Sequence, residues 1–256
     1  MTPKLAPEFL TTPLAHRALH DVTDGRPENS RAAISAAIDA GYGIEIDLQL
    51  SSDNQAMVFH DYGLQRLAHA KGAVRQKSAS ELADIALIGG DEGIPTLPEV
   101  LELVRGRVPL LIELKDQDGQ MGPNIGALES AAVAALNAYQ GPVAVMSFNP
   151  HSVAEMATLC PQIPRGITTS SYIYDRWPTL PMSVCDHLRG IPDFDRVGAS
   201  FISHEVDDLS RARVADLKSE GADILCWTVT SQSLEDEARK VAANITFEQY
   251  LAKIPA

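Results

Sequence analysis

Short runs of hydrophobic residues alternate with longer Ala-rich stretches along this chain from Leu14 onward. Short apolar runs bounded by polar residues predict strands, whereas apolar positions at helical spacing predict helices. Residues 56–60 look extended, and eight further runs predict strands over residues 14–17, 44–50, 108–115, 143–147, 165–169, 197–203, 223–229 and 244–247. Eight strands that alternate with helices favour a (β/α)8 TIM barrel over an open doubly wound sheet.

The helical stretches carry their own start signals. A helix over residues 30–40 has Asn29 or Ser30 as its cap, and a glycine follows its last residue. Thr96 and Glu99 have the spacing of a capping box, which predicts a second helix start. Further helices are predicted over residues 124–139, from residue 150, and over 207–220 and 233–243.

Residues 61–95 interrupt this alternation. They are polar and rich in turn formers, and only residues 80–87 have a weak helical pattern. We therefore expect a small insertion after the second strand of the barrel. The length of 256 residues suits one large domain, so we expect a single domain that covers residues 1–256.

Composition limits the location and the partners of the protein. The apolar share of 45% is sufficient for a core, and the net charge of −13 argues against a nucleic-acid partner. The first ten residues lack the pattern of a signal peptide, and no apolar run approaches the length of a membrane span. Three widely spaced cysteines match no zinc motif and predict buried thiols in a reducing compartment: Cys160, Cys185 and Cys226. We expect a cytoplasmic protein without stable membrane insertion.

The strand over residues 44–50 alternates strictly, so that Glu45 and Asp47 lie on its polar face. Two neighbouring carboxylates fit a solvated sheet surface, which is the commoner case for an isolated strand. They also fit a divalent cation site, where the cation cancels their mutual repulsion. No glycine-rich nucleotide-binding motif follows any predicted strand, so neither a dinucleotide fold nor an NTPase is supported.

Catalytic residues of TIM barrels lie at the carboxyl ends of the strands and on the loops that follow. This rule selects a set of polar and aromatic residues at four of the predicted strands and just beyond: His16, Arg17, Glu45, Asp47, His60, Glu113, Lys115 and Trp227. Taken singly, His16 fits a histidine buried in the core, and Arg17 fits a salt bridge at the barrel rim. Lys115 fits a lysine at the end of a strand whose ammonium reaches out to solvent. Their joint placement at one mouth favours a functional site.

These residue types suit the cleavage of a phosphodiester. Three carboxylates without a thiolate make a site for a hard cation, Mg²⁺ or Ca²⁺. Arg17 offers a planar fork for phosphate, and Lys115 offers a point charge. His16 and His60 can serve as the acid and base that move protons between nucleophile and leaving group.

Several ordered motifs extend from His16 to nearly the end of the chain. They are His16-Arg17, Pro27-Glu28-Asn29-Ser30, Ile44-Glu45-Ile46-Asp47, Val58-Phe59-His60-Asp61 with Leu64 and Arg66 after it, Ile94 to Leu101, Glu113-Leu114-Lys115, Ser147-Phe148-Asn149 and Cys226 to Val229. In this order they resemble the glycerophosphodiester phosphodiesterase family. That family usually has glycine after His-Arg, whereas this chain has Ala18, so the loop after the first strand is expected to differ slightly.

The resemblance implies a TIM barrel that hydrolyses glycerophosphodiesters, such as glycerophosphocholine or glycerophosphoethanolamine, to glycerol 3-phosphate and an alcohol. By similarity, three carboxylates would hold the metal, two histidines would form the acid–base pair, and two cations would bind the phosphate. The metal ligands would be Glu45, Asp47 and Glu113. The acid–base pair would be His16 and His60, and the phosphate-binding cations would be Arg17 and Lys115. Trp227 is predicted to contact the substrate, with core packing as the equal alternative.

Other segments leave alternatives open. The loop over residues 170–184 carries Tyr172, Tyr174 and Trp177, which either contact the alcohol part of the substrate or pack on the barrel rim. Docking on a membrane surface is a further alternative, which the absence of a basic amphipathic helix argues against. His20 and Asp24 are expected to be solvated and not catalytic. The remaining histidines are expected on the surface or in helices: His69, His151, His187 and His204. Two rival functions remain: a phospholipase D-type lyase that acts on lysophospholipid or sphingomyelin, and a non-catalytic protein that binds a phosphate ligand.

Overall fold

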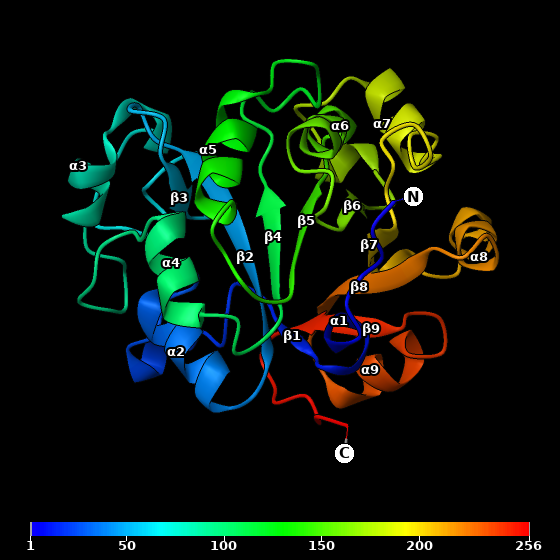
Figure 1. Ribbon diagram of the computed structural model, residues 1–256, viewed down its shortest axis with the longest axis horizontal. Coiled ribbons are helices and arrows are strands. Elements are labelled where there is room, and N and C mark those ends of the chain that lie inside the picture. The colour runs from blue at the N-terminus through cyan, green and yellow to red at the C-terminus, as the bar shows by residue number, and fades with distance from the viewer. Residues whose placement is uncertain (1, 256) are drawn as a thin grey trace.

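The computed structural model describes residues 2–255 of the chain. Within them, eight parallel strands form a closed barrel (Figure 1), which confirms the fold predicted from the sequence. The barrel strands are β1 (Leu14–Ala15), β2 (Gly43–Leu50), β4 (Leu110–Leu114), β5 (Val143–Ser147), β6 (Arg165–Thr169), β7 (Phe201–Glu205), β8 (Asp223–Val229) and β9 (Asn244–Phe247). The barrel closes because β1 pairs with both β2 and β9.

The predicted strand bounds agree with the structure at β5, β6, β8 and β9. The clearest error concerns β7, which begins at Phe201 although the apolar run suggested a strand from residue 197. Gly198 has a φ of +59°, so the residues before β7 form a turn instead of extended chain. The later start places Glu205 at the carboxyl end of the strand.

Nine helices lie within residues 2–255. They are α1 (Glu8–Thr11), α2 (Arg31–Asp39), α3 (Ala79–Ala83), α4 (Leu97–Val104), α5 (Ala127–Leu136), α6 (Pro150–Leu159), α7 (Met182–Arg189), α8 (Ala212–Ser219) and α9 (Gln232–Ala238). Ser30 caps α2, and Thr96 forms a capping box with Glu99 at α4, as predicted. In this part of the chain, no helix is long and apolar enough to cross a bilayer.

Two helical predictions need correction. The helix expected over residues 207–220 is divided into a 3₁₀ turn, Val206–Asp208, and α8. Helix α7 was not expected, because aromatic residues and prolines dominate the segment before it. It lies beyond the carboxyl ends of β6 and β7 at the upper right of Figure 1.

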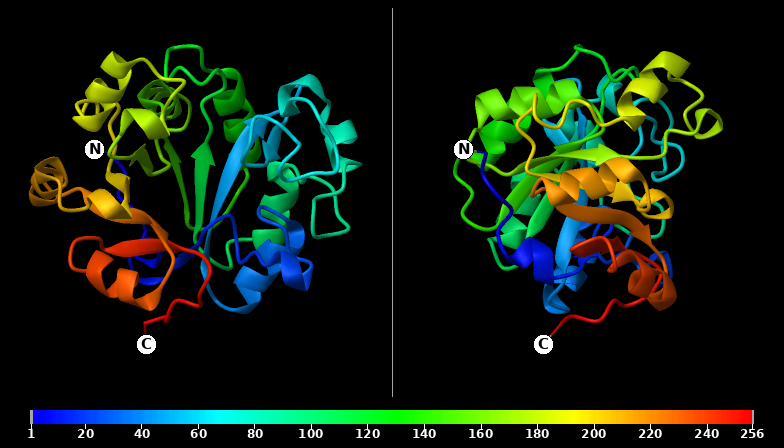
Figure 2. Two further views of the ribbon diagram at one scale, coloured as in Figure 1. Left: turned by 180° about the vertical axis from the view of Figure 1, so that it is seen from behind. Right: turned by 90° about the vertical axis from the view of Figure 1, so that its right-hand side faces the viewer.

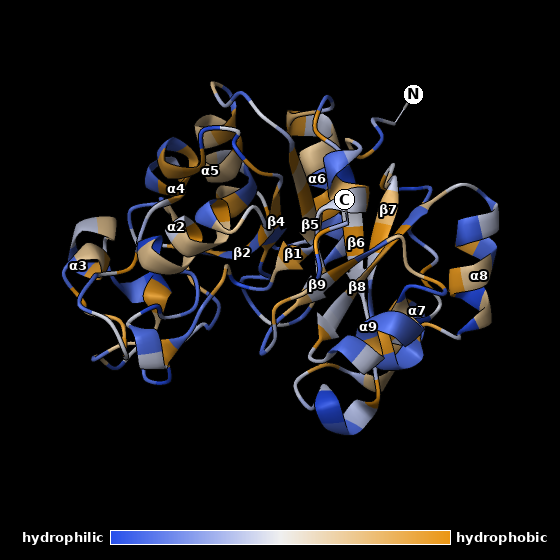
Figure 3. Ribbon diagram, turned by 90° about the horizontal axis from the view of Figure 1, so that it is seen from below, coloured by the Kyte–Doolittle hydropathy of each residue, from blue (hydrophilic) through white to orange (hydrophobic). Residues whose placement is uncertain are grey.

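Strand β2 is buried on both faces, although its alternating pattern predicted only one buried face. Ile44, Ile46 and Leu48 point outward and pack against the helix layer. The intervening polar residues therefore point into the barrel, where the other strands shield them from solvent. Figure 3 shows that α8, on the outside of the barrel, carries both apolar and polar residues. The polar face of β2 is thus the inner wall of the barrel.

An apolar cluster fills the amino-terminal end of the barrel. It contains Leu14, Leu111, Phe201 and Leu225 from the strands, together with Phe9 from α1. The segment that carries Phe9 runs along the barrel from the N-terminus (Figures 1 and 2). This plug leaves the polar inner residues near the carboxyl ends of the strands.

Residues 61–95 follow β3 (Ala56–Val58), which is antiparallel to β2. They include the 3₁₀ turn Val74–Gln76 and α3, and they lie at the edge of the molecule beside β3 (cyan in Figure 1). A small core of their own holds this segment together, with Met57 and Phe59 packed against Leu64 and Leu82. The segment thereby fixes the chain just after His60.

Candidate active site

A cavity of about 560 Å³ opens at the carboxyl ends of the barrel strands. This volume lies in the usual range for small-molecule sites, roughly 300–1,000 Å³. Seven of the eight residues selected from the sequence line it: His16, Arg17, Glu45, His60, Glu113, Lys115 and Trp227. The eighth, Asp47, lies behind them and is almost fully buried. The structure therefore brings the whole predicted set to one place.

Three carboxylates form a compact buried cluster on the inner wall. Parallel pairing of β2 with β4 places Asp47 beside Glu113, and Glu45 lies two residues earlier on the same face of β2. One oxygen from each of the three lies within 4.8 Å of the others. Burial raises the pKa of both Glu45 and Glu113, and the charge of Asp47 adds to this shift. An extra positive charge at this point would relieve the repulsion.

Lys115 lies between two of these carboxylates. Its Nζ is 2.7 Å from Oδ1 of Asp47 and 2.6 Å from Oε1 of Glu113. Despite burial, which acts in the opposite direction, the ammonium of Lys115 lowers the pKa of Asp47. Asn29 supports the same carboxylate, because its Nδ2 donates to Oδ2 of Asp47 at 2.9 Å. Among the three carboxylates, Asp47 is therefore the one whose ionised form its neighbours favour most.

Arg17 links the end of β1 to the cluster through its backbone and its side chain. Its backbone N–H donates to Oε2 of Glu45 at 3.0 Å, and its Nη1 donates to Oε1 of Glu28 at 2.8 Å. Its Nε is buried without a hydrogen-bond acceptor among the described residues and lies 3.7 Å from Oδ2 of Asp47. A buried guanidinium nitrogen without an acceptor suits an anionic ligand.

Ala18 occupies a backbone position that favours glycine. Its φ is +66°, in the left-handed region, and its side chain is buried. The neighbouring Arg17 also has a positive φ of +53°. The loop after β1 therefore retains the conformation that glycine would adopt, at the cost of strain at Ala18. This conformation holds the Arg17 amide against Glu45.

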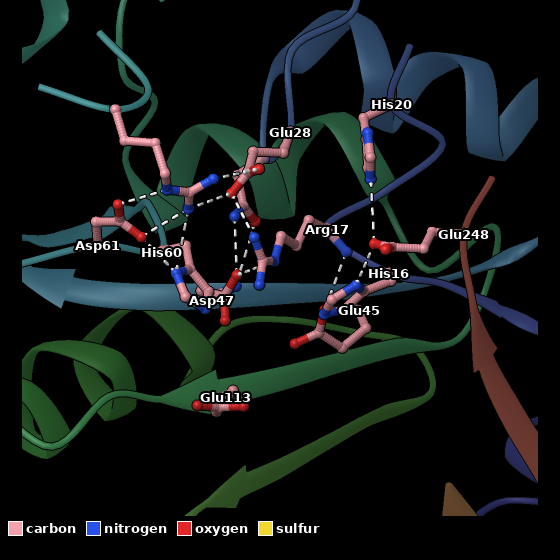
Figure 4. A network of polar contacts seen from close by, with 12 residues as sticks. His16, Arg17, His20, Glu28, Glu45, Asp47, His60, Asp61, Glu113 and Glu248 are labelled. Atoms are coloured by element: carbon pink, nitrogen blue, oxygen red, sulfur yellow. Dashed lines mark hydrogen bonds and ion pairs between the residues drawn. The ribbon is translucent and has the colours of Figure 1, made fainter. Parts of the chain in front are cut away.

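His16 is paired with a carboxylate from the other end of the chain. Its Nδ1 lies 2.7 Å from Oε2 of Glu248, which follows β9 (Figure 4). This contact lowers the pKa of Glu248, while burial lowers the pKa of His16. An ionised carboxylate only accepts hydrogen bonds, so Nδ1 carries the proton and Nε2 of the neutral ring is left with its lone pair.

His20 shares the same carboxylate. Its Nε2 is buried and lies 3.6 Å from Oε2 of Glu248, although the side chain as a whole is 24% exposed, so His20 is only partly solvated. Asp24 is mostly exposed, as expected. Figure 4 shows His16 and His20 on opposite sides of the Glu248 side chain.

His60 has a similar partner that is adjacent in the sequence. Its Nδ1 lies 2.6 Å from Oδ1 of Asp61, and Arg66 donates to both oxygens of that carboxylate. Arg66 also donates to Glu28, which binds Arg17, so one chain of charged contacts joins the two sides of the mouth. Gln49 fixes the backbone here by donating to the carbonyl of His60 at 3.0 Å. In both His16 and His60, Nδ1 is thus paired with a carboxylate.

Aromatic residues line the opposite side of the cavity. Trp227 lies at the end of β8, Phe148 follows β5, and Trp177 comes from the loop after β6. Tyr172 of that loop is fully buried, and Tyr174 is exposed and donates to Asp186. Of the three aromatic residues noted in the loop, Trp177 is thus the one that reaches the cavity.

Several residues of this site were not selected from the sequence. Glu248 and Asp116 directly follow predicted strands, so the strand-end rule could have found them, and Asp61 stood in a quoted motif without a role. Glu205 was missed because β7 was placed too early. His204, which was assigned to the surface or a helix, is instead fully buried on β7. Side chains of a strand alternate between its two faces, and Phe201 and Glu205 lie on the face toward the barrel interior. The side chain of His204 therefore points away from the interior.

Comparison with known proteins identifies the relatives of this chain. The model of the glycerophosphoryl diester phosphodiesterase family matches residues 16–246. The chain belongs to this family. Its relatives include YhdW of Bacillus subtilis, a candidate glycerophosphodiester phosphodiesterase that is 29% identical over 230 residues and 86% of each chain. The glycerophosphodiester phosphodiesterase of Caldanaerobacter subterraneus subsp. tengcongensis is 30% identical over 59% of this chain and 65% of its own length.

Solved structures agree with this assignment. A phosphodiesterase of Oleispira antarctica, in complex with the product sn-glycerol-3-phosphate, has a TM-score of 0.77 and 25% identity, with 96% of each chain covered. A protein from Parabacteroides distasonis has a TM-score of 0.73 and shares the fold at 23% identity, over 93% of this chain and 92% of that chain. Members of the family are phosphoric diester hydrolases, and this glycerophosphodiester phosphodiesterase carries its polar cluster at the mouth of the same barrel.

Proposed function

We propose that this glycerophosphodiester phosphodiesterase hydrolyses glycerophosphodiesters, such as glycerophosphocholine or glycerophosphoethanolamine, to glycerol 3-phosphate and an alcohol. One observation carries the proposal: two histidines, each held by a carboxylate, line a cavity beside a cluster of three buried carboxylates. The product bound to the Oleispira antarctica enzyme supports the choice of substrate class.

Glu45, Asp47 and Glu113 would hold a divalent cation, Mg²⁺ or Ca²⁺. The donor set fits, because it consists of three carboxylates and no sulfur, and because two of them have a pKa raised by burial and by the neighbouring charge. When bound, such a cation supplies Lewis-acid neutralisation of phosphate oxygens.

Arg17 and Lys115 would bind the phosphate. The buried Nε of Arg17 has no acceptor among the described residues, and its fork is held in place by Glu28. Lys115 reaches the same point from β4 and carries a compact charge on a flexible stem. Both cations line the cavity next to the carboxylate cluster, so they can neutralise a phosphate that binds there.

His16 and His60 would move the protons. One Nε2 takes the proton of the nucleophile, which is either water or the glycerol 2-hydroxyl of the substrate, and the other Nε2 protonates the departing alkoxide. Glu248 and Asp61 engage Nδ1 of the two rings, so Nε2 of the neutral histidine would be free to take a proton, while Nε2 of the other histidine, in its imidazolium form, would give one to the leaving oxygen. Attack by the 2-hydroxyl would form a cyclic phosphate that water then opens.

Two readouts test this function: an assay coupled to glycerol 3-phosphate release for the deacylated diesters, and choline release for both choline substrates, because cleavage of lysophosphatidylcholine frees choline but no glycerol 3-phosphate. Purified protein would be offered glycerophosphocholine, glycerophosphoethanolamine and lysophosphatidylcholine, each before and after treatment with EDTA. We expect release from the two deacylated diesters, loss of activity after metal removal, and recovery with Mg²⁺ or Ca²⁺. Full activity without metal would contradict the metal site, and a preference for lysophosphatidylcholine would favour the lyase. Binding without turnover would favour the non-catalytic protein.

The remaining proposals concern organisation and location. We propose that residues 1–256 form one domain with an insertion at about residues 61–95, because the insertion packs its own small core onto β3. We also propose a cytoplasmic location, which is supported by three buried cysteines without a disulfide.

A further inference from the structure

The cavity has two chemically different walls. Its charged wall comes from the ends of β1, β2 and β4 and carries the residues proposed for the phosphate and the metal. The opposite side, here called the aromatic wall, consists of Phe148, Trp177 and Trp227. A glycerol 3-phosphate unit bound at the charged wall would leave the aromatic wall for the alcohol part of the diester. The chemistry of this wall therefore bears on which alcohol the enzyme takes.

The aromatic wall is continuous. The ring centroid of Phe148 lies 5.4 Å from that of Trp227 and 5.2 Å from that of Trp177. The first pair is nearly perpendicular, at 86°, and the second is tilted at 60°. Rings in such arrangements pack favourably and present different combinations of face and edge to the cavity. A ligand that lies against this wall would contact more than one aromatic ring.

Hydrogen bonds hold the aromatic wall in place. Trp227 donates from Nε1 to the backbone carbonyl of Ser203 at 3.0 Å. The loop that carries Trp177 is anchored by Glu205, whose carboxylate accepts from the amide and hydroxyl of Ser171 and from Arg176. A prearranged wall saves the entropy of ordering these side chains on binding.

A buried carboxylate lines the same cavity and is hydrogen-bonded to the residue that follows Phe148. Asp116 lines the cavity and is only 5% exposed. Its Oδ1 accepts from Nδ2 of Asn149 at 2.7 Å, and its Oδ2 accepts from the backbone N–H of Met121 at 3.1 Å. Among the described residues, no lysine, arginine or histidine nitrogen pairs with it, in contrast to Asp47 and Glu113. Burial raises the pKa of Asp116.

A carboxylate that lines a cavity together with aromatic rings, without a cation of its own, suits a positively charged ligand. Aromatic faces attract cations, most strongly when the cation loses little hydration on binding. A quaternary ammonium fits this requirement, because it has no N–H donors that would need acceptors. A primary ammonium would leave donors unpaired against the rings, and an anion would be repelled by Asp116.

We propose that Asp116 and the aromatic wall form a subsite for an alcohol that carries a quaternary ammonium group, as choline does. This inference rests on the proposed function and specifies its substrate class. The enzyme would bind the phosphate at the charged wall and place the trimethylammonium group of the leaving alcohol against the side of the aromatic wall that faces the cavity. Asp116 would supply the counter-charge.

Substrate selectivity tests the subsite. The kcat/KM values for glycerophosphocholine and for glycerophosphoglycerol, whose alcohol is neutral, would be compared in the wild type, Asp116→Asn and Trp177→Leu. We expect the wild type to prefer the choline diester, and each variant to lower the ratio of the two values by about tenfold. A merely structural loss would lower both values together and leave the ratio constant. Asp118→Asn is the matched control, since Asp118 is exposed on the same loop and lies outside the cavity lining.

A binding measurement separates this proposal from the proposed function. The chain has two tryptophans, and both belong to the aromatic wall, so intrinsic fluorescence reports on the subsite directly. Choline chloride should change the fluorescence saturably, whereas sodium chloride at equal ionic strength should not, and Asp116→Asn should weaken the response. If no diester is cleaved but choline binds, the function fails and the subsite stands. Cleavage of both diesters with equal efficiency, or an unchanged ratio in Asp116→Asn, would overturn the subsite.

Discussion

Oε2 of Glu248 lies 2.7 Å from Nδ1 of His16, although 232 positions separate the two residues. Barrel closure causes this contact, because β1 pairs directly with β9 and both strands deliver their next residues to the same mouth. The other histidine, His60, takes its carboxylate from the adjacent Asp61. Both histidines are thus paired with a carboxylate through Nδ1. The partner of His60 is its neighbour in the sequence, whereas the partner of His16 follows the last strand of the barrel.

Replacing Glu248 with glutamine should lower kcat more than it changes KM. The glutamine amide can offer Nδ1 of His16 either an acceptor or a donor, so the ring loses its fixed tautomer and the stabilisation of its protonated form. We expect kcat to fall by at least about tenfold, by analogy with other carboxylate-supported histidines. Steady-state kinetics would measure this, with the exposed Glu237→Gln as control. An unchanged kcat would remove Glu248 from the mechanism.

The two histidines should each be needed for turnover. His16→Ala and His60→Ala remove the proposed acid and base, and we expect each to lower kcat by about a hundredfold or more. The exposed His69→Ala is the control and should behave as the wild type. Near-native turnover of either variant would exclude that histidine as acid or base.

Asp47→Asn should weaken metal binding and activity together. The substitution preserves size and leaves Lys115 paired with Glu113, so the fold should persist. Removing one anionic ligand of three should raise the dissociation constant for Mg²⁺ or Ca²⁺ by at least about tenfold. Calorimetric titration of the metal-free protein would measure this, with circular dichroism to confirm folding and exposed Asp91→Asn as control. Unaltered metal affinity would show that the cation binds elsewhere.

Ala18→Gly should stabilise the protein slightly. The positive φ of Ala18 costs roughly 1–2 kcal/mol for a residue with a Cβ, and the extra freedom of glycine in the unfolded chain offsets part of the gain. We expect the free energy of unfolding in urea to rise by up to about 1 kcal/mol. Ala37→Gly, within α2, should instead destabilise by about 1 kcal/mol or more. Equal destabilisation by both substitutions would contradict strain at Ala18.

His204 should make stability depend on pH. Its ring is fully buried, with Nδ1 2.7 Å from Oγ1 of Thr169 and Nε2 3.2 Å from Oδ2 of Asp208. Burial lowers the pKa of His204 below its usual value of 6.5, although Asp208 opposes the shift. The unfolded chain therefore binds a proton more readily than the folded protein, so this contribution is complete above pH 6.5 and is lost as the pH falls.

Urea unfolding of the wild type and His204→Gln at a series of pH values would test this effect. Glutamine can keep polar contacts but does not titrate in this range. The wild type should lose more stability than the variant on acidification from about pH 8 to about pH 5. Parallel losses in the two proteins would show that His204 does not contribute.

The sequence by itself determined the barrel and most of its inner wall. Hydrophobic periodicity is a local property, so it located β5, β6, β8 and β9 and showed that Glu45 and Asp47 share one face of β2. The carboxyl ends of the strands in a parallel barrel meet at one mouth, and this rule alone predicted that the eight selected residues lie close together. Motif order then pointed to the family that the comparisons confirm.

Only the tertiary structure decided how these residues are supported. The pairing of β1 with β9 brought Glu248 to His16, and the register of β2 with β4 placed Lys115 between two carboxylates. The burial of Asp116 in the cavity that the aromatic wall also lines depends on loops after different strands. Such contacts join segments far apart in the chain, and local patterns carry no information on the closure and loop packing that create them.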